Sequence, residues 1–494
     1  MSSEPPVRVR FAPSPTGRFH IGGARTALYD YLIARQTGGQ FILRIEDTDQ
    51  KRFDPAAEAE IIESLHWLGM DWDEGPDIGG PYGPYRQSER KQSYQAHAET
   101  LLARGHAYRC FCSPERLAQR RQAQQQAKQS PRYDGLCRKL DPAESQERAR
   151  RGESHVIRFK TPPAGTTTAI DLIRGPITVE NSDLDDYILM KSNGLPVYHL
   201  AAIVDDRLMR ISHVLRGSEW LPTFPLHVLL YQAFGWEQPQ WVHLSVFLNP
   251  AGKGKMSKRQ AIDAKGGAQT IYPLDLRQAG YLPEAVVNWI ALMGWSFDDH
   301  TEFFSLPDLI RSFSLAKLTP SPAAVNFTKL DHFNGLHIRA LTVDDLTRRL
   351  VPVFQAAGLS TSETALRRVT PLIQERIRTL EEAVEIAGFF FRESLAPPTV
   401  AMLPIGVTAP AGVQALQRSS AVVAAVPQFT PEALEAALRQ LAEQLGLTAA
   451  QLFSLLRVAT TGQTVSPPLV ETMVILGSSL VTERLEAAAR QLAN

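Results

Sequence analysis

FAPSPTGRFHIGG, residues 11–23, is the stretch of sequence that decides the fold. Residues 7–11 alternate and are rich in β-forming side chains, which is typical of a strand. Residues 22–39 carry apolar side chains at helical spacing and end in two glycines, which predicts a helix. A second strand is predicted at residues 41–47. This order of strand, loop, helix and strand is a βαβ unit, which predicts a parallel sheet.

The loop has the features of a phosphate-binding turn. Backbone N–H groups at the start of a helix point outward and carry partial positive charge, so they favour anions. Gly22 and Gly23 would let a ligand approach the backbone closely, and His20 could donate to a phosphate oxygen. Pro13 and Pro15 would hold the loop in one shape. The loop matches neither the G-x-G-x-x-G fingerprint nor the Walker A pattern, and a structural turn with an incidental histidine is the alternative.

A second stretch, NPAGKGKMSKR at residues 249–259, places basic side chains between glycines. A basic loop of this kind can close on a polyphosphate and neutralise the charge that develops during phosphoryl or nucleotidyl transfer. A solvated surface loop is the alternative.

The composition and the charge balance of the chain exclude several classes of protein. Lysine plus arginine equals aspartate plus glutamate at 52 each, so the chain is no blanket polycation, although a local basic face would be enough to bind nucleic acid. Three cysteines are too few for a disulfide framework and indicate a reducing compartment. No apolar run approaches the roughly 20 residues that span a bilayer. We expect a cytoplasmic protein without a membrane partner.

The rest of the chain indicates a split sheet followed by helices. Residues 109–197 are rich in glutamine and arginine and then in short β-like pieces, which predicts an inserted α+β module. The α/β pattern then resumes, with a strand predicted at 198–206 and a helix at 218–235. The C-terminal part is typical of helices, with one apolar stripe over 373–384 and another helix that Thr430 caps.

Several of these segments resemble one known family. HIGG after APSPTG, with KMSKR far downstream, resembles the HIGH and KMSKS signatures of class I aminoacyl-tRNA synthetases. The longer matches are similar to bacterial glutamyl-tRNA synthetases and span residues 10–259; they are RFAPSPTGRFHIGGARTAL, FILRIEDTD, WLGMDWDEGP, GPYRQSER, YHLAAIVDD and KMSKR. Gly23 stands where HIGH has its second histidine, and Arg259 stands where KMSKS has its last serine; both are usual in this family.

The resemblance implies a fold and a division of the chain. The fold class is α/β, with a Rossmann-type parallel sheet split by an α+β insertion and followed by an all-α C-terminal region. The implied parts are, in order, the first half of the catalytic domain, an inserted acceptor-binding domain, the second half of the catalytic domain, a stem-contact domain and a helical anticodon-binding region. Their boundaries are 1–108, 109–197, 198–260, 261–333 and 334–494.

The resemblance also implies a reaction. Glutamate attacks the α-phosphate of ATP, which Mg²⁺ accompanies, and the glutamyl group of the adenylate passes to the 3′ end of tRNA(Glu) in protein synthesis. Because the glutamate carboxylate is itself the nucleophile, catalysis would rest on positioning and electrostatics. The implied catalytic residues are His20, which would bind phosphate, and Lys255 and Lys258, which would stabilise the departing pyrophosphate.

Two sets of binding residues follow from the resemblance. A glutamate site must neutralise the side-chain carboxylate, which a guanidinium does with two parallel hydrogen bonds. The implied glutamate site consists of Arg10, Ala12, Ser14, Glu46, Tyr198, Ala202 and Arg216. The implied ATP site consists of Gly17, His20, Gly22, Gly23, Glu219, Leu248, Lys255, Ser257, Lys258 and Arg259. Ala202 departs from the asparagine expected in close relatives, so we assign it only to the pocket lining.

The cysteines indicate a metal site. Cys110 and Cys112 stand one residue apart, and Tyr133 and Cys137 follow. Some relatives bind zinc with three thiolates and one phenolate, so the resemblance implies a structural Zn²⁺ at these four residues. His106 is a competing fourth ligand, and three reduced thiols without a metal are the alternative.

Other functions share part of the pattern. A glutaminyl enzyme would carry a β-barrel anticodon domain, and the truncated relative that modifies a tRNA base would lack an anticodon-binding half, whereas the region after residue 329 is typical of helices. A non-catalytic tRNA-binding paralogue and a nucleotidyltransferase acting on a small metabolite are alternatives from other classes. The enzyme could charge tRNA(Glu) alone or also tRNA(Gln), and Arg376 lies where an anticodon contact is expected. We expect a monomer.

Overall fold

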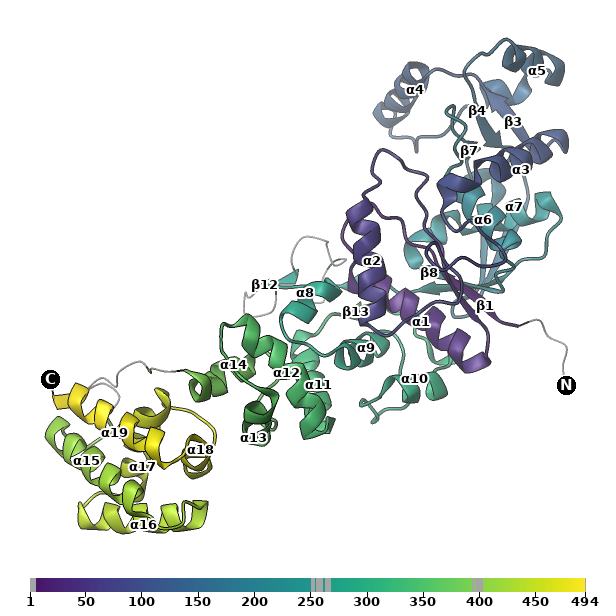
Figure 1. Ribbon diagram of the computed structural model, residues 1–494. Coiled ribbons are helices and arrows are strands. Elements are labelled where there is room, and N and C mark those ends of the chain that lie inside the picture. Colours follow the sequence, from purple (N-terminus) through teal and green to yellow (C-terminus); the bar gives the residue numbers. More distant parts are fainter. Residues whose placement is uncertain are drawn as a thin grey trace. The chain divides into compact units, whose positions relative to one another are not determined.

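The computed structural model describes residues 6–249, 254, 261–262, 268–392, 395 and 403–493. The chain divides into two compact units, one made of Met1–Leu276 with Val286–Phe327 and the other of Arg277–Ala285 with Thr328–Asn494. Among the described residues, strands and helices mix in the first unit, whereas the second contains helices alone (Figure 1). The predicted all-α C-terminal region is therefore confirmed.

The predicted βαβ unit opens the first unit. Its elements are β1 (Arg8–Phe11), α1 (Ile21–Thr37) and β2 (Gln40–Leu43), and α2 (Pro55–Trp67) and α3 (Lys91–Ala103) follow. β1 pairs in parallel with β2. Gly38 is the C-cap of α1, and its φ of 64° lies in the left-handed region that suits glycine. The second strand was predicted to reach residue 47 but ends at Leu43, because the chain then leaves β1 and Ile45 makes an isolated bridge to Arg86.

A second pair of parallel strands follows the insertion, in a sheet separate from that of β1 and β2. β8 (His213–Gly217) and β9 (Gln240–Leu244) pair in parallel, and α7 (Phe224–Phe234) connects them. The backbone N–H of Ser212 donates to the Arg8 carbonyl at 2.9 Å, which sets the start of β8 beside β1. The Rossmann-type parallel arrangement split by an insertion is confirmed.

The insertion is of the α+β type, as predicted. Its elements are β3 (Ala107–Cys110), α4 (Pro114–Gln126), α5 (Pro142–Arg150), β4 (Val156–Phe159), β5 (Thr166–Asp171), β6 (Gly175–Glu180) and β7 (Ile188–Met190). β3, β4 and β7 form an antiparallel sheet of their own. β5 pairs with β6 and also reaches β9 through the pair Asp171 and Trp241, so this hairpin extends the sheet of β8 and β9.

One element differs in kind from its prediction. Residues 198–206 belong to a helix, α6 (Tyr198–Leu208), and not to a strand. Every side chain from His199 to Asp206 is buried, so the helix has no solvent-facing stripe and its sequence lacks the period of an amphipathic helix. Periodicity alone does not separate a short apolar run in a buried helix from a buried strand.

The remaining elements of the first unit are short, and two of them run into the second unit. They are β10 (Phe247–Leu248), β11 (Ala261–Ile262), β12 (Ala268–Gln269), α8 (Pro273–Gln278), α9 (Pro283–Ala291), α10 (Leu306–Ser312) and β13 (Ala323–Ala324). The region predicted as a helix at 218–235 begins with a 3₁₀ turn, Ser218–Thr223, before α7, and Pro222 lies inside that turn.

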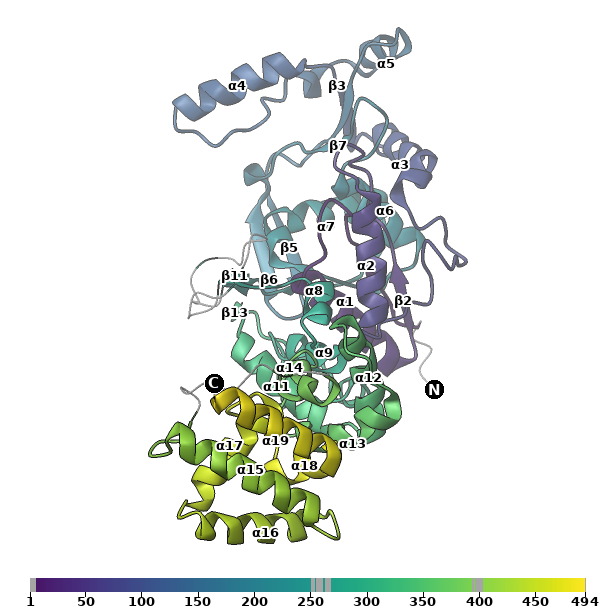
Figure 2. The ribbon, with the colours of Figure 1, turned by 60° about the vertical axis from the view of Figure 1, so that its left-hand side comes forward.

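From α11 onward, the described residues of the second unit form nine α-helices. They are α11 (Phe327–Ala340), α12 (Val343–Ala356), α13 (Glu363–Ile373), α14 (Glu382–Ala387), α15 (Ala409–Ala425), α16 (Pro431–Gln444), α17 (Ala449–Thr461), α18 (Leu469–Leu476) and α19 (Ser478–Ala493). α16 begins as predicted, because the Thr430 hydroxyl accepts from the backbone N–H of Ala433. α15 and α19 lie side by side over a leucine-rich core (Figure 2).

The stripe predicted over residues 373–384 is interrupted. α13 ends at Ile373 and α14 begins at Glu382, and between them the backbone N–H of Leu380 donates to the Gly280 carbonyl at 2.9 Å. This bond to another segment takes the place of a helical bond, while Ile373 and Ile377 remain buried. No helix in the described part of the chain combines the length and the apolar character needed to cross a bilayer.

Candidate active site

His20 ties the loop after β1 to the first turn of α1. Its ring Nδ1 accepts a hydrogen bond from the Gly22 N–H at 3.0 Å, so His20 is the N-cap of the helix. In a neutral imidazole one nitrogen accepts and the other donates, so this bond assigns the proton to Nε2. A Cβ on Gly22 would lie 2.8 Å from the His20 ring, so glycine makes room for the ring to fold back. His20 therefore offers a donor next to the N–H groups that begin α1.

A cavity of about 420 Å³ opens at this loop, a volume within the range of small-molecule sites. Six of the residues predicted to bind substrate line it: Ser14, Gly17, His20, Gly22, Gly23 and Glu219. The Glu219 carboxylate occupies the place where a Cβ on Gly217 would stand, so a side chain at Gly217 would displace Glu219. The cavity thus combines a helix N-terminus, an imidazole donor and a carboxylate.

A buried cluster of four charged side chains lies around the end of β1. Arg10 Nε donates to Asp206 Oδ1 at 2.9 Å, and Arg44 Nη1 donates to the same oxygen at 2.7 Å. Arg44 Nη2 also donates to Glu46 Oε1 at 3.1 Å. Burial by itself would raise the pKa of Asp206, but Arg10 and Arg44 hold this pKa below its usual value. Asp206 therefore stays ionised and fixes both guanidinium groups.

Arg216, near the end of β8, is held by two histidines. Its Nε donates to His243 Nε2 at 2.9 Å, and its Nη1 donates to His227 Nδ1 at 2.8 Å. Nη1 also lies 3.5 Å from the hydroxyl of Tyr198, whose ring stacks on Trp220 with 3.9 Å between centroids. Arg216 Nη2 is buried and has no hydrogen-bond partner among the described residues. Because an unpaired buried cationic donor is costly, this atom suits a carboxylate that a ligand supplies.

The predicted glutamate-binding residues do not all face the same cavity. Ser14 lines it, whereas Arg10, Ala12, Glu46, Tyr198, Ala202 and Arg216 do not. Tyr198 interacts electrostatically with Arg216, Glu46 and Arg10, so these four side chains share one neighbourhood. Ala202 is buried in α6, and Ala12 is half-buried after β1.

Five residues of the predicted ATP site are not among the described residues that line the cavity. Lys255, Ser257, Lys258 and Arg259 lie outside the described residues. Leu248 is half-buried in β10, next to Phe247, which lines the cavity. The segment after residue 270 contacts the loop before α1: the Ile21 N–H donates to the Ile271 carbonyl at 2.9 Å, and Arg18 Nη1 donates to Asp275 at 2.9 Å.

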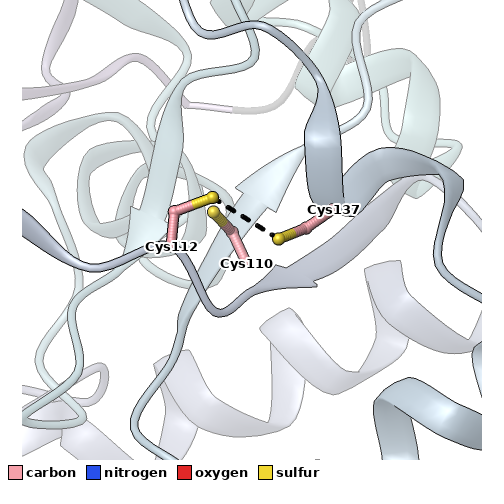
Figure 3. Close-up of side chains that lie close together, drawn as sticks. All are labelled: Cys110, Cys112 and Cys137. Carbon is pink, nitrogen blue, oxygen red and sulfur yellow. Dashed lines mark hydrogen bonds between the residues drawn. The ribbon is translucent and has the colours of Figure 1, made fainter. Parts of the chain in front are cut away.

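The three cysteines of the insertion lie together (Figure 3). Their Sγ atoms are all within 4.8 Å of one another, and Cys112 Sγ is 3.6 Å from Cys137 Sγ. The Tyr133 hydroxyl lies 3.3 Å from Cys110 Sγ and 3.4 Å from Cys112 Sγ. Tetrahedral zinc with Zn–S bonds of about 2.3 Å needs sulfur atoms about 3.8 Å apart, so the spacing fits one Zn²⁺. His106 is not part of this group in the described structure.

Two arginines accompany the cysteines. Arg116 Nη1 lies 3.5 Å from Cys112 Sγ, and the Arg158 guanidinium carbon lies 4.1 Å from the centroid of the Tyr133 ring. Burial raises the pKa of the Cys112 thiol to about 11. In the protein alone this thiol is therefore protonated at neutral pH, and a bound metal cation would displace its proton.

Sequence reasoning missed the residues that hold the arginines. Asp206 ends the segment YHLAAIVDD and Arg44 stands in FILRIEDTD, and a charge at the end of a buried apolar run is a signal that a partner must exist. His227 and His243 stand inside apolar segments, where a lone histidine gives no signal beyond a core position.

The split parallel sheet, the histidine-capped loop at the start of α1 and the helical second unit define a class I aminoacyl-tRNA synthetase. Residues 6–332 match the family model described as tRNA synthetases class I (E and Q), catalytic domain, and residues 345–489 match the model described as anticodon binding domain. The chain belongs to the glutamate–tRNA ligase family of these enzymes.

Individual relatives match over nearly the whole chain. The glutamate–tRNA ligase of Roseiflexus sp. (strain RS-1) is 47% identical over 99% of this chain and 97% of its own length. The glutamate–tRNA ligase of Dehalococcoides mccartyi is 45% identical over 98% of each chain. A crystal structure of a glutamate tRNA ligase from Elizabethkingia meningosepticum, in complex with its amino acid, has a TM-score of 0.89 at 36% identity and covers 98% of this chain and 99% of that one.

Proposed function

We propose that the chain is a glutamate–tRNA ligase, which joins L-glutamate to ATP as glutamyl-adenylate and transfers the glutamyl group to the 3′ end of tRNA(Glu). The observation that carries the proposal is Arg216 Nη2, a buried cationic donor without a partner among the described residues. A substrate with a side-chain carboxylate would pair with this donor, whereas a neutral side chain would leave its charge buried and uncompensated. Membership of the family supports the same substrate.

The adenylation step needs no nucleophile from the protein. The α-carboxylate of glutamate attacks the α-phosphorus of ATP, and pyrophosphate leaves, so the chain supplies position and charge. His20 Nε2 and the N–H groups at the start of α1 would donate to phosphate oxygens in the cavity, with Glu219 at its wall. Lys255 and Lys258 would neutralise the departing pyrophosphate, a role that rests on their sequence pattern. Mg²⁺ accompanies ATP.

The roles in glutamate binding follow from the pairings in the structure. Arg216 would bind the side-chain carboxylate through Nη2. Arg10 already donates to Asp206 and to the Leu215 carbonyl. It would therefore attract glutamate through its positive charge more than through a new hydrogen bond. Glu46 would accept from the α-ammonium group, because it keeps one oxygen beyond its bond to Arg44.

The remaining predicted contacts with glutamate are less specific. Ser14 and Tyr198 would donate from their hydroxyls, and Ala12 and Ala202 would line the pocket.

The parts of the chain outside the cavity would bind the tRNA. The insertion, 109–197, would approach the acceptor end, residues 261–333 the stem, and residues 334–494 the anticodon, where Arg376 is an expected contact. The match of residues 345–489 to an anticodon binding domain supports the last of these assignments.

The cysteine cluster is proposed as a structural Zn²⁺ site. Cys110, Cys112, Cys137 and Tyr133 would hold the metal, whose chemistry there is to cross-link two segments of the insertion. Three thiolates and one phenolate around Zn²⁺ carry a net charge of −2, which the Arg158 guanidinium would offset in part, whereas Arg116 already pairs with Asp134.

The test is charging of purified tRNA(Glu) and tRNA(Gln) with labelled glutamate and ATP, with metal content measured on the same preparation. ATP-dependent charging of tRNA(Glu) and about one Zn²⁺ per chain are expected. Charging of tRNA(Gln) as well would identify a non-discriminating ligase. Failure to charge either tRNA would contradict the proposed function, and a metal content near zero in enzyme purified without chelators would contradict the zinc site alone.

A further inference from the structure

We propose that His227 and His243 are positioning residues for Arg216: as neutral imidazoles they accept its Nη1 and Nε protons and thereby direct Nη2 toward the side-chain carboxylate of the bound amino acid. This inference rests on the proposed function, in which Arg216 binds that carboxylate.

One assignment of protons satisfies the whole chain of hydrogen bonds. A guanidinium only donates, so His243 Nε2 and His227 Nδ1 must both be unprotonated acceptors toward Arg216. The proton of His243 is then on Nδ1, which donates to Asp171 Oδ2 at 2.8 Å. The proton of His227 is on Nε2, which donates to His199 Nδ1 at 2.9 Å. Each hydrogen bond in this chain is therefore donated by the group nearer to Arg216 and accepted by the group farther from it.

The chain of bonds is shielded from water. His243, His227 and Asp171 are 0%, 1% and 1% exposed. Burial and the charge of Arg216 lower the pKa of His227 well below its usual value. At His243 they outweigh the Asp171 carboxylate, which raises the pKa, and bring it to about 4. Both rings are therefore neutral at the pH of translation, as the accepting role requires.

The five residues come from five elements of the sheet and its helices. Asp171 ends β5, His199 lies in α6, Arg216 in β8, His227 in α7 and His243 in β9. Because each element is anchored in the core, the acceptors are fixed before any ligand arrives.

Two fixed acceptors on Nε and Nη1 remove most of the conformational freedom of the Arg216 side chain, which also lies 4.9 Å from the centroid of the Trp241 ring. A guanidinium that is already oriented loses less entropy on binding a carboxylate. The histidines should therefore act on the affinity for the amino acid and not on the affinity for ATP.

The experiment compares matched variants of the full chain in charging of tRNA(Glu). His227→Asn and His243→Gln keep an amide oxygen near the position of the accepting nitrogen, whereas His227→Leu and His243→Leu remove the acceptor at similar volume. The leucine variants should raise the KM for glutamate roughly ten- to hundredfold and leave the KM for ATP within about twofold. The amide variants should recover most of this loss.

A swapped pair keeps the test decisive if the leucine variants fail to fold. His227→Gln and His243→Asn also introduce an amide, but they place its oxygen near the ring nitrogen that does not face Arg216. They should therefore raise the KM for glutamate, whereas His227→Asn and His243→Gln should not. Equal KM values for the matched and swapped amides, or a parallel rise in the KM for ATP, would overturn the inference. Wild-type enzyme that does not charge tRNA(Glu) would instead overturn the proposed function.

Discussion

Replacing Asp206 with asparagine should weaken the first unit, because Asp206 balances two buried arginines. Asp206 is 2% exposed and accepts hydrogen bonds from Arg10 and Arg44. Asparagine has the same shape and keeps an oxygen acceptor, but it removes the negative charge. Arg44 would still pair with the carboxylate of Glu46, whereas Arg10 would be left with neutral acceptors alone, the asparagine oxygen and the Leu215 carbonyl.

The size of the effect can be estimated. Removing one partner of a buried ion pair costs about 3–5 kcal/mol, because it leaves a buried charge uncompensated. The first unit has roughly 320 residues, and an unfolding entropy of about 2.1 cal/mol/K per residue gives about 0.7 kcal/mol/K. The Tm of this unit should therefore fall by about 4–7 °C.

Calorimetry of the full chain at pH 7 measures this shift. Glu99→Gln is the matched control, because Glu99 is 61% exposed and pairs with Arg109 at the surface, so its Tm should change by less than about 1 °C. Arg10 and Arg44 lower the pKa of Asp206 in the folded state. The ionised carboxylate therefore stabilises the fold fully at pH values above its pKa in the unfolded state, and this stabilisation is lost as the pH falls through its pKa in the folded state. The difference between wild type and Asp206→Asn should thus shrink below about pH 4. A shift no larger than that of Glu99→Gln would refute the reasoning.

His20→Asn keeps an oxygen that can cap α1 but removes the Nε2 donor, so kcat for charging should fall about 100-fold with the Tm kept within about 1 °C. An unchanged kcat would contradict the phosphate-binding role. Asp30→Asn should raise the Tm at neutral pH. Neither Asp30 oxygen has a hydrogen-bond partner among the described residues, and burial raises its pKa well above the usual value, so ionisation opposes folding. The increase in Tm caused by Asp30→Asn should grow as the pH rises from 5. A Tm difference that does not depend on pH would contradict this effect of ionisation. Gly217→Ala should displace the Glu219 carboxylate and raise the KM for ATP roughly tenfold. Equal KM values for ATP in the wild type and Gly217→Ala would show that Glu219 does not contribute to nucleotide binding.

Local patterns in the sequence were enough to predict the opening of the fold. The alternation before residue 11, the helical spacing after Gly22 and the glycines at 38–39 are local signals, and β1, α1 and β2 follow from them. α6 could not be recognised in the same way. Its environment removes the solvent-facing side on which an amphipathic pattern depends, and Asp206 is buried only because arginines from β1 and the segment after β2 meet it.

The site was predictable to the extent that it is local. His20 and its glycines lie in one short stretch at the start of α1, so their geometry follows from that stretch. Arg216 is different, because its orientation depends on acceptors from α7 and β9 and, behind them, on Asp171 in the insertion. Partners this far apart in the sequence leave no spacing signal, and only the packed sheet brings them together.

The most direct test of glutamate recognition is the ratio of kcat/KM for glutamate to that for glutamine in charging of tRNA(Glu) by the wild-type enzyme. Glutamine has nearly the same shape, but its neutral amide would leave the Arg216 charge buried and unpaired. The structure therefore predicts a preference for glutamate on the order of 10³. Similar kcat/KM values for the two amino acids would contradict the assignment of Arg216 as the ligand of the side-chain carboxylate.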